Sequence, residues 1–217
     1  GMDGAFGLQP GWLQADILIN TDSEEEGEIY MGCAGGIDVK TTVDLTYEAI
    51  PANHIVKKLV LKGLNGGHSG GDIHLGLGNA NKLLARFLAE HADELALKLI
   101  DFHGGTLRNA IPREAHIIFA IPADKATQLN SITTEFEALL KSELAIAEKN
   151  LAIELTDTST EKPVFTADCQ SRTINLLNAM PNGVIRMSDD VEGVVETSLN
   201  VGVVSIVDDK VEILCLI

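Results

Sequence analysis

The sequence predicts an α+β fold built on a ferredoxin-like β-α-β-β-α-β unit, and three observations support this prediction. Two segments carry apolar residues at helical spacing, at residues 79–91 and 123–150. Four apolar runs of strand length flank these helices, at residues 54–64, 95–104, 113–122 and 151–157. In chain order these segments match the split β-α-β arrangement, an antiparallel sheet with two helices on one face.

The first part of the chain is predicted to form short strands separated by glycines. Residues 15–20 read "ADILIN", a short buried strand, and Asp22 follows its carboxyl end, where α/β proteins place their ligands. A second short strand is predicted at residues 28–33 and a long alternating strand at residues 37–47. The glycine-rich hinge between them, residues 32–36, is a candidate domain boundary.

The later helices and strands are predicted from the same kind of evidence. The helix at residues 79–91 presents an apolar face made of Ala80, Leu83, Leu84, Phe87 and Leu88. Beyond the β-α-β-β-α-β unit we predict a helix at residues 166–180, a short strand at 184–188, and a hairpin that pairs 199–207 with 210–217 around Asp208 and Asp209. These additional strands could extend the sheet.

Composition limits the classes of partner. The chain has 217 residues and a formal charge of −16, which disfavours nucleic acid and anionic membranes as partners. Its apolar runs are too short to span a bilayer and no signal peptide opens it, so a cytoplasmic location is expected. The cysteines, Cys33, Cys169 and Cys215, are widely spaced and fit reduced thiols better than a disulfide framework.

The stretch "GLNGGHSGGDIHLGLGNAN", residues 63–81, is the segment richest in candidate functional residues. Its glycines allow positive φ angles and close approach of a ligand, so that His68 and Ser69 are presented to solvent. It could be a phosphate loop, although the lysine of such loops is missing, or a metal site formed by His68, Asp72 and His74. His68 could also donate a hydrogen bond to a substrate carbonyl or oxyanion, or the segment could be an ordinary surface loop.

Two further candidates are weaker when each is taken alone. Asn109 lies between two predicted strands, just before Ile111-Pro112, and an asparagine on such a turn can offer its amide to a carboxylate or simply form the turn. Asp22 could ligate zinc while the glutamates after it only solvate the loop.

Four strings together resemble the M20 family of dizinc aminopeptidases and dipeptidases. They are "MDGAFGL", "ILINTDSEEEGEIYMGCAGG", "GLNGGHSGGDIH" and "GGTLRNAIPREA", and the similarity runs through the full chain. The resemblance implies that residues 1–36 are a remnant of an α/β catalytic domain and that residues 37–217 form the lid, or dimerisation, domain. The family's remaining metal ligands are expected before Gly1 and after Ile217, in a longer parent protein.

The resemblance also implies site residues and a mechanism. Asp22 matches the family's aspartate zinc ligand, His68 the lid histidine that polarises the scissile carbonyl, and Asn109 the lid asparagine that holds the substrate's carboxylate. The carboxylate-binding arginine has no secure match, although Arg108 and Arg113 are nearby. Two zinc ions would activate a water molecule that attacks the peptide carbonyl of unblocked dipeptides, including Xaa-His.

A homodimer formed through the lid is expected for the parent, and no activity is expected for this chain by itself, because one candidate ligand cannot hold two zinc ions. The alternative hypothesis is a non-catalytic, ferredoxin-like binding or dimerisation module.

Overall fold

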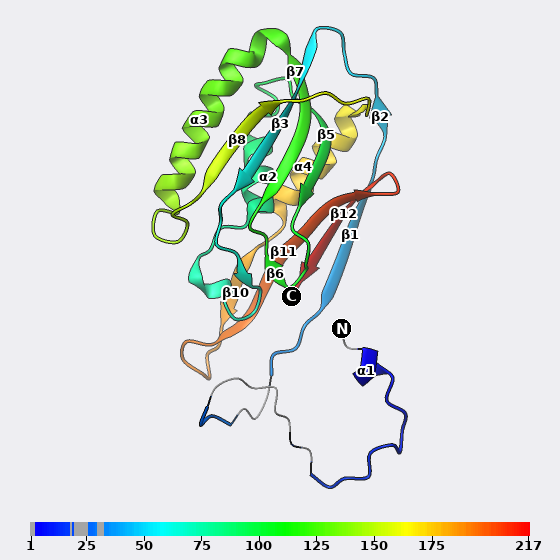
Figure 1. Ribbon diagram of the computed structural model, residues 1–217, viewed down its shortest axis with the longest axis vertical. Helices are drawn as coiled ribbons and strands as arrows, with labels where there is room; N and C mark the ends of the chain where they lie inside the picture. The colour runs from blue at the N-terminus through cyan, green and yellow to red at the C-terminus, as the bar shows by residue number, and fades with distance from the viewer. Residues whose placement is uncertain (1–2, 18, 20–25, 30–32) are drawn as a thin grey trace. The chain divides into compact units, whose positions relative to one another are not determined.

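The computed structural model describes residues 3–17, 19, 26–29 and 33–217 (Figure 1). It divides into two compact units, Gly1–Gly35 and Gly36–Ile217. The described part of the first unit contains a short helix, α1 (Asp3–Phe6), followed by turns and irregular chain.

The prediction of short strands at residues 15–20 and 28–33 is wrong for those of these residues that the structure describes. Residues 15–17, 19, 28–29 and 33 have no strand structure, and Ile17, Ile19 and Ile29 are 79%, 81% and 92% exposed. A buried strand needs hydrogen-bonded neighbours on its edges and packing on its faces, and the described part of this unit supplies neither.

The second unit contains twelve strands, arranged in one large sheet and two two-stranded sheets, β2-β9 and β4-β6. Its strands are β1 (Asp38–Asp44), β2 (Tyr47–Glu48), β3 (His54–Lys62), β4 (Gly67–His68), β5 (Lys98–Gly104), β6 (Ala110–Ile111), β7 (Ala115–Pro122), β8 (Ala152–Asp157), β9 (Val164–Phe165), β10 (Gly183–Met187), β11 (Val195–Val207) and β12 (Lys210–Leu216). Its helices are α2 (Ala80–His91), α3 (Ala126–Glu143) and α4 (Ala167–Ala179), with short 3-10 turns η1 (Ile73–Leu75) and η2 (Ala123–Lys125).

The main sheet has the strand order β1-β12-β11-β5-β7-β3-β8, with β10 added beside β11. Every neighbouring pair is antiparallel. The predicted hairpin is present as β11 and β12, and Asp208 and Asp209 take φ angles of 49° and 56°, as a two-residue hairpin turn requires. The prediction of an α+β fold with a large antiparallel sheet is therefore confirmed.

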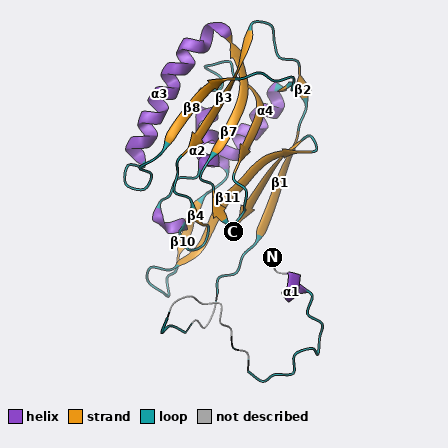
Figure 2. Cartoon of the chain, in the orientation of Figure 1, coloured by secondary structure: helices purple, strands orange, loops and turns teal. Residues whose placement is uncertain are grey.

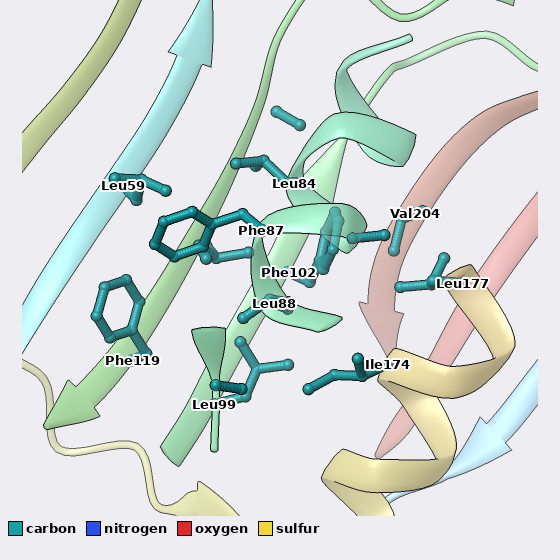
Figure 3. Close-up of a cluster of buried hydrophobic side chains, with 14 of the residues drawn as sticks. Leu59, Leu84, Phe87, Leu88, Leu99, Phe102, Phe119, Ile174, Leu177 and Val204 are labelled. Carbon is teal, nitrogen blue, oxygen red and sulfur yellow. The ribbon is translucent and has the colours of Figure 1, made fainter. Parts of the chain in front are cut away.

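Helices α2, α3 and α4 contribute to one core on one face of the sheet (Figure 2). Phe87 of α2 lies at the centre of this core, and its ring meets that of Phe136 of α3 edge to face with centroids 5.3 Å apart. Figure 3 shows Phe87 among side chains from the sheet, such as Leu59 and Phe119, and from α4, such as Leu177. The alternation of apolar residues along β3 and β7 produces this face.

Two predicted elements are shorter than expected, for identifiable reasons. The strand predicted at residues 37–47 divides after Asp44, because Tyr47 leaves the main sheet to pair with Phe165 of β9. The helix predicted at residues 123–150 ends at Glu143, and Glu148 turns inward to accept two backbone hydrogen bonds. No helix in the described ranges is long and apolar enough to cross a membrane.

Candidate functional site

His68 and Asn109 lie close together, and a short β ladder brings them there. Gly67 and His68 of β4 pair with Ile111 and Ala110 of β6, and the backbone N–H of Ser69 donates to the carbonyl of Asn109 at 3.0 Å. The two loops meet although they are distant in the sequence. The third predicted site residue, Asp22, lies outside the described residues.

The His68 ring is exposed and its orientation is fixed by its own loop. Its Nδ1 accepts the backbone N–H groups of Gly70 at 3.0 Å and Gly71 at 3.1 Å. A ring nitrogen that accepts two hydrogen bonds carries a lone pair, so the proton of the neutral imidazole is on Nε2. The loop therefore presents an Nε2–H donor, which is the form needed to hydrogen-bond a carbonyl oxygen.

Asp72 holds the backbone of His68 and does not join it in a metal site. The Asp72 carboxylate accepts the His68 N–H at 2.7 Å, and the Asp72 N–H donates to the His68 carbonyl at 3.0 Å. Across the described ranges, no three or more His, Cys, Asp or Glu side chains gather in a way that could hold a metal ion. The alternative metal site formed by His68, Asp72 and His74 is therefore not supported.

A buried glutamate that the sequence analysis missed clamps the ends of the His68 loop. Glu148 is 2% exposed, and its two carboxylate oxygens accept the backbone N–H groups of Asn65 at 2.7 Å and Gly78 at 2.8 Å. Charge-assisted bonds of this kind are stronger than neutral ones. The only signal in the sequence was an acidic residue inside the apolar pattern "LAIAEKNLAI".

The arginines beside Asn109 are engaged elsewhere. The Arg108 guanidinium forms an ion pair with Asp38 of β1, and Arg113 Nε donates to the carbonyl of Leu64 at 3.2 Å. Asn109 itself is half-buried. The Arg108 guanidinium is thus paired with Asp38, whereas Arg113 also lines the cavity beside these loops.

A cavity of about 560 Å³ opens beside the two loops, on the face of the sheet opposite the helices. Gly67 and Ala110, the neighbours of His68 and Asn109, line it together with basic groups from Lys58, His116 and Arg113. Burial, and then the nearby Lys58, lower the pKa of His116, which favours the neutral form of its ring.

Comparisons with known proteins give a matching family model and similar proteins. Residues 59–148 match the M20 family described as "Peptidase dimerisation domain". Over 217 residues the chain is 64% identical to the cytosol non-specific dipeptidase of Escherichia coli K12, covering 100% of this chain and 45% of that protein. The aminoacylhistidine dipeptidase of Vibrio alginolyticus has a crystal structure that matches with a TM-score of 0.89 and 58% identity, over 100% of this chain and 44% of that one.

The chain thus spans less than half the length of the relatives that it matches. Those relatives are dipeptidases by name, and both matches run through the whole of this chain. The β4–β6 corner that joins His68 and Asn109 lies inside the segment that matches the dimerisation domain. Residues 59–148 therefore carry the dimerisation domain of the M20 peptidases, within a chain that is similar over its whole length to part of two dipeptidases.

Proposed function

We propose that this chain is the lid portion of a zinc dipeptidase that hydrolyses unblocked dipeptides, including Xaa-His. One observation carries the proposal: the β4–β6 ladder presents an Nε2–H donor on His68 beside the loop that carries Asn109. A dipeptide has a scissile carbonyl and a free carboxylate only a few bonds apart, and the paired loops offer a donor for each. The names of the matching dipeptidases support this substrate class.

His68 is assigned the role of oxyanion donor. During peptide hydrolysis the carbonyl oxygen gains negative charge, so a donor already aimed at that oxygen stabilises the transition state more than the substrate. The two glycine N–H groups on Nδ1 keep the ring from presenting its acceptor side instead. His68 therefore needs no reorientation when charge develops.

Asn109 is assigned to the carboxylate end of the dipeptide. Its amide N–H₂ group can donate to a carboxylate oxygen, and Lys58 and Arg113 outnumber the single acidic residue, Glu114, along the adjacent cavity, which favours an anionic group there. This contact is made equally in the ground state and the transition state. Losing it should raise KM more than it lowers kcat.

The metal ions are assigned to the rest of the parent protein. Asp22, outside the described residues, is the one zinc ligand proposed in this chain. The described residues offer no group that could hold a metal ion. This chain alone should therefore not catalyse hydrolysis.

The domain assignment and the expected partners belong to the same proposal. Residues 1–36 would be a remnant of the catalytic domain and residues 37–217 the lid. Strands β8, β3, β7 and β5 are neighbours in that order, with α2 and α3 in the connections, which supports a ferredoxin-like lid core. A homodimer formed through the lid, in the cytoplasm, is the expected state of the parent.

The test uses the full-length parent protein and a dipeptide that ends in histidine. His68→Ala should lower kcat by about 100-fold or more, because an oxyanion donor is lost. His74→Ala is the matched control, since His74 is an exposed histidine of the same segment and should keep normal activity. If His68→Ala retains normal kcat, the catalytic role is wrong and the non-catalytic binding module becomes the better hypothesis.

A further inference from the structure

Asn200, on strand β11, hydrogen-bonds to the backbone of the loop that carries Asn109. Its side-chain amide donates to the carbonyl of Arg108 at 2.9 Å and to the carbonyl of Ala110 at 2.9 Å. These are the carbonyls on either side of Asn109. Asn200 is 0% exposed, so the amide that donates these two part-buried bonds is itself shielded from water.

A network of neighbouring asparagines fixes the orientation of the Asn200 amide. Asn79 Nδ2 lies 3.3 Å from Asn200 Oδ1 and 2.9 Å from Asn182 Oδ1, and it donates to the Val201 carbonyl at 3.1 Å. A flipped Asn200 amide would set its oxygen against the carbonyls of Arg108 and Ala110 and its N–H₂ against that of Asn79. The amide of Asn200 can therefore serve this loop only as a donor.

The network is anchored in the helical layer. Asn79 caps α2, because its Oδ1 accepts the backbone N–H of Lys82 at 3.1 Å, and Asn182 Oδ1 accepts the backbone N–H of Val201 at 3.0 Å. Asn200, which lies on a strand of the main sheet, is thus linked through Asn79 to the start of a helix. Rigid elements of this kind position a site more accurately than a free loop does.

The backbone of β11 is shaped to receive the Asn109 loop. The pairing of β11 with β12 shifts register between Val201 and Val203, and Gly202 lies at the shift. A Cβ at Gly202 would lie 2.6 Å from the Arg108 Cα, and a Cβ at Gly105 would lie 1.9 Å from the Gly202 carbonyl oxygen. Only glycines permit this approach, so the close contact between strand β11 and the loop depends on glycine at both positions.

We propose that Asn200 is a positioning residue for Asn109, and that β11, outside the matched dimerisation-domain segment, is therefore part of the substrate-binding machinery. This inference rests on the proposed function. A backbone bond from the Ser69 N–H to the Asn109 carbonyl joins this loop to the His68 loop, whose ring is held separately by the N–H groups of Gly70 and Gly71. The substrate contact that Asn200 supports is the one made by Asn109, and Asn200 acts through it.

The test compares the same chemical change at two positions of one network, in the full-length protein. Asn200→Asp removes the donors to both loop carbonyls and places a carboxylate beside them, so KM for the dipeptide should rise about tenfold or more while kcat changes little. Asn182→Asp keeps an acceptor oxygen for Asn79 and Val201, so KM should stay within about twofold of the unsubstituted value. Asn109→Ala measures the full loss of the contact.

The outcomes separate this inference from the proposed function. If Asn109→Ala raises KM but Asn200→Asp does not, the positioning role is wrong while the proposed function stands. The positioning role is also wrong if Asn182→Asp raises KM as much as Asn200→Asp, because the effect would then come from added charge. If Asn109→Ala leaves KM unchanged, the proposed role of Asn109 fails and the inference fails with it.

A milder variant covers the case in which Asn200→Asp does not fold. Asn200→Ser is neutral and can keep at most one of the two donations, so it should raise KM by a smaller factor with kcat unchanged. An unchanged KM in a folded Asn200→Ser protein would overturn the proposal.

Discussion

The loop that carries His68 and the loop that carries Asn109 are held at different points. Glu148 binds the two ends of the His68 loop and leaves its tip exposed. Asn200 instead binds the backbone on both sides of Asn109. A histidine that donates to a reacting oxygen requires a fixed ring orientation. A residue that recognises a carboxylate requires a fixed backbone position. We infer that each clamp suits the task of its loop.

The largest effect should come from closing the space between the Asn109 loop and β11. Gly105→Ala should lower the free energy of unfolding by about 3 kcal/mol or more, because φ is 70° and the added Cβ would meet the Gly202 carbonyl at 1.9 Å. Gly76→Ala, at the same φ of 70° but with nothing within 4 Å, should cost only about 1 kcal/mol. Urea denaturation of both variants measures the difference, and equal losses would contradict the close contact.

An intermediate effect is expected at the clamp of the His68 loop. Glu148→Gln replaces one acceptor oxygen by an N–H₂ group, so either the Asn65 or the Gly78 N–H loses its partner, at a cost of about 2 kcal/mol. Glu192→Gln, at an exposed glutamate, is the control and should be neutral. Amide hydrogen exchange should quicken at Asn65 and Gly78 before it does in β11. Unchanged exchange rates at both amides would show that Glu148 does not hold the ends of the His68 loop.

The smallest effect is expected in how the stability of the fold depends on pH, through His116. Burial first, and then Lys58, lower the pKa of His116 in the folded state. The unfolded chain therefore binds more protons, and stability should be lost as pH falls below the ordinary histidine pKa of about 6.5. In thermal unfolding between pH 7.5 and 5, His116→Gln should reduce this loss and His74→Gln, at an exposed site, should not. Equal pH dependence in all three proteins would exclude His116 as the cause.

The sequence predicted elements whose partners are local. The helix at residues 79–91 was expected from its apolar face, and the structure starts it at Ala80 with Asn79 as its cap. The hairpin of β11 and β12 was expected from its turn and has the predicted register around Asp208 and Asp209. Where the pattern needed partner strands that the described chain does not provide, as at residues 15–17 and 19 of the strand predicted at 15–20, the prediction was wrong for those described residues.

The candidate site was predictable only in part. His68 and Asn109 stand in glycine-rich and turn-forming segments, and the structure brings them together. The residues that hold their loops were not found, because Glu148 is 83 positions from Asn65 and Asn200 is 92 positions from Arg108. Hydrogen bonds over such separations depend on the folded topology and leave no local pattern. Asp22, outside the described residues, stays a prediction.

The most direct measurement is the zinc content and the dipeptide hydrolysis of the 217-residue chain itself, with the full-length parent beside it and a dipeptide ending in histidine as substrate. The chain alone should bind no zinc pair and show no turnover, while the parent should hydrolyse the dipeptide. Turnover by the chain alone, with two zinc ions bound, would mean that it contains a complete site, and the proposed division of the site between this chain and the rest of the parent would be wrong.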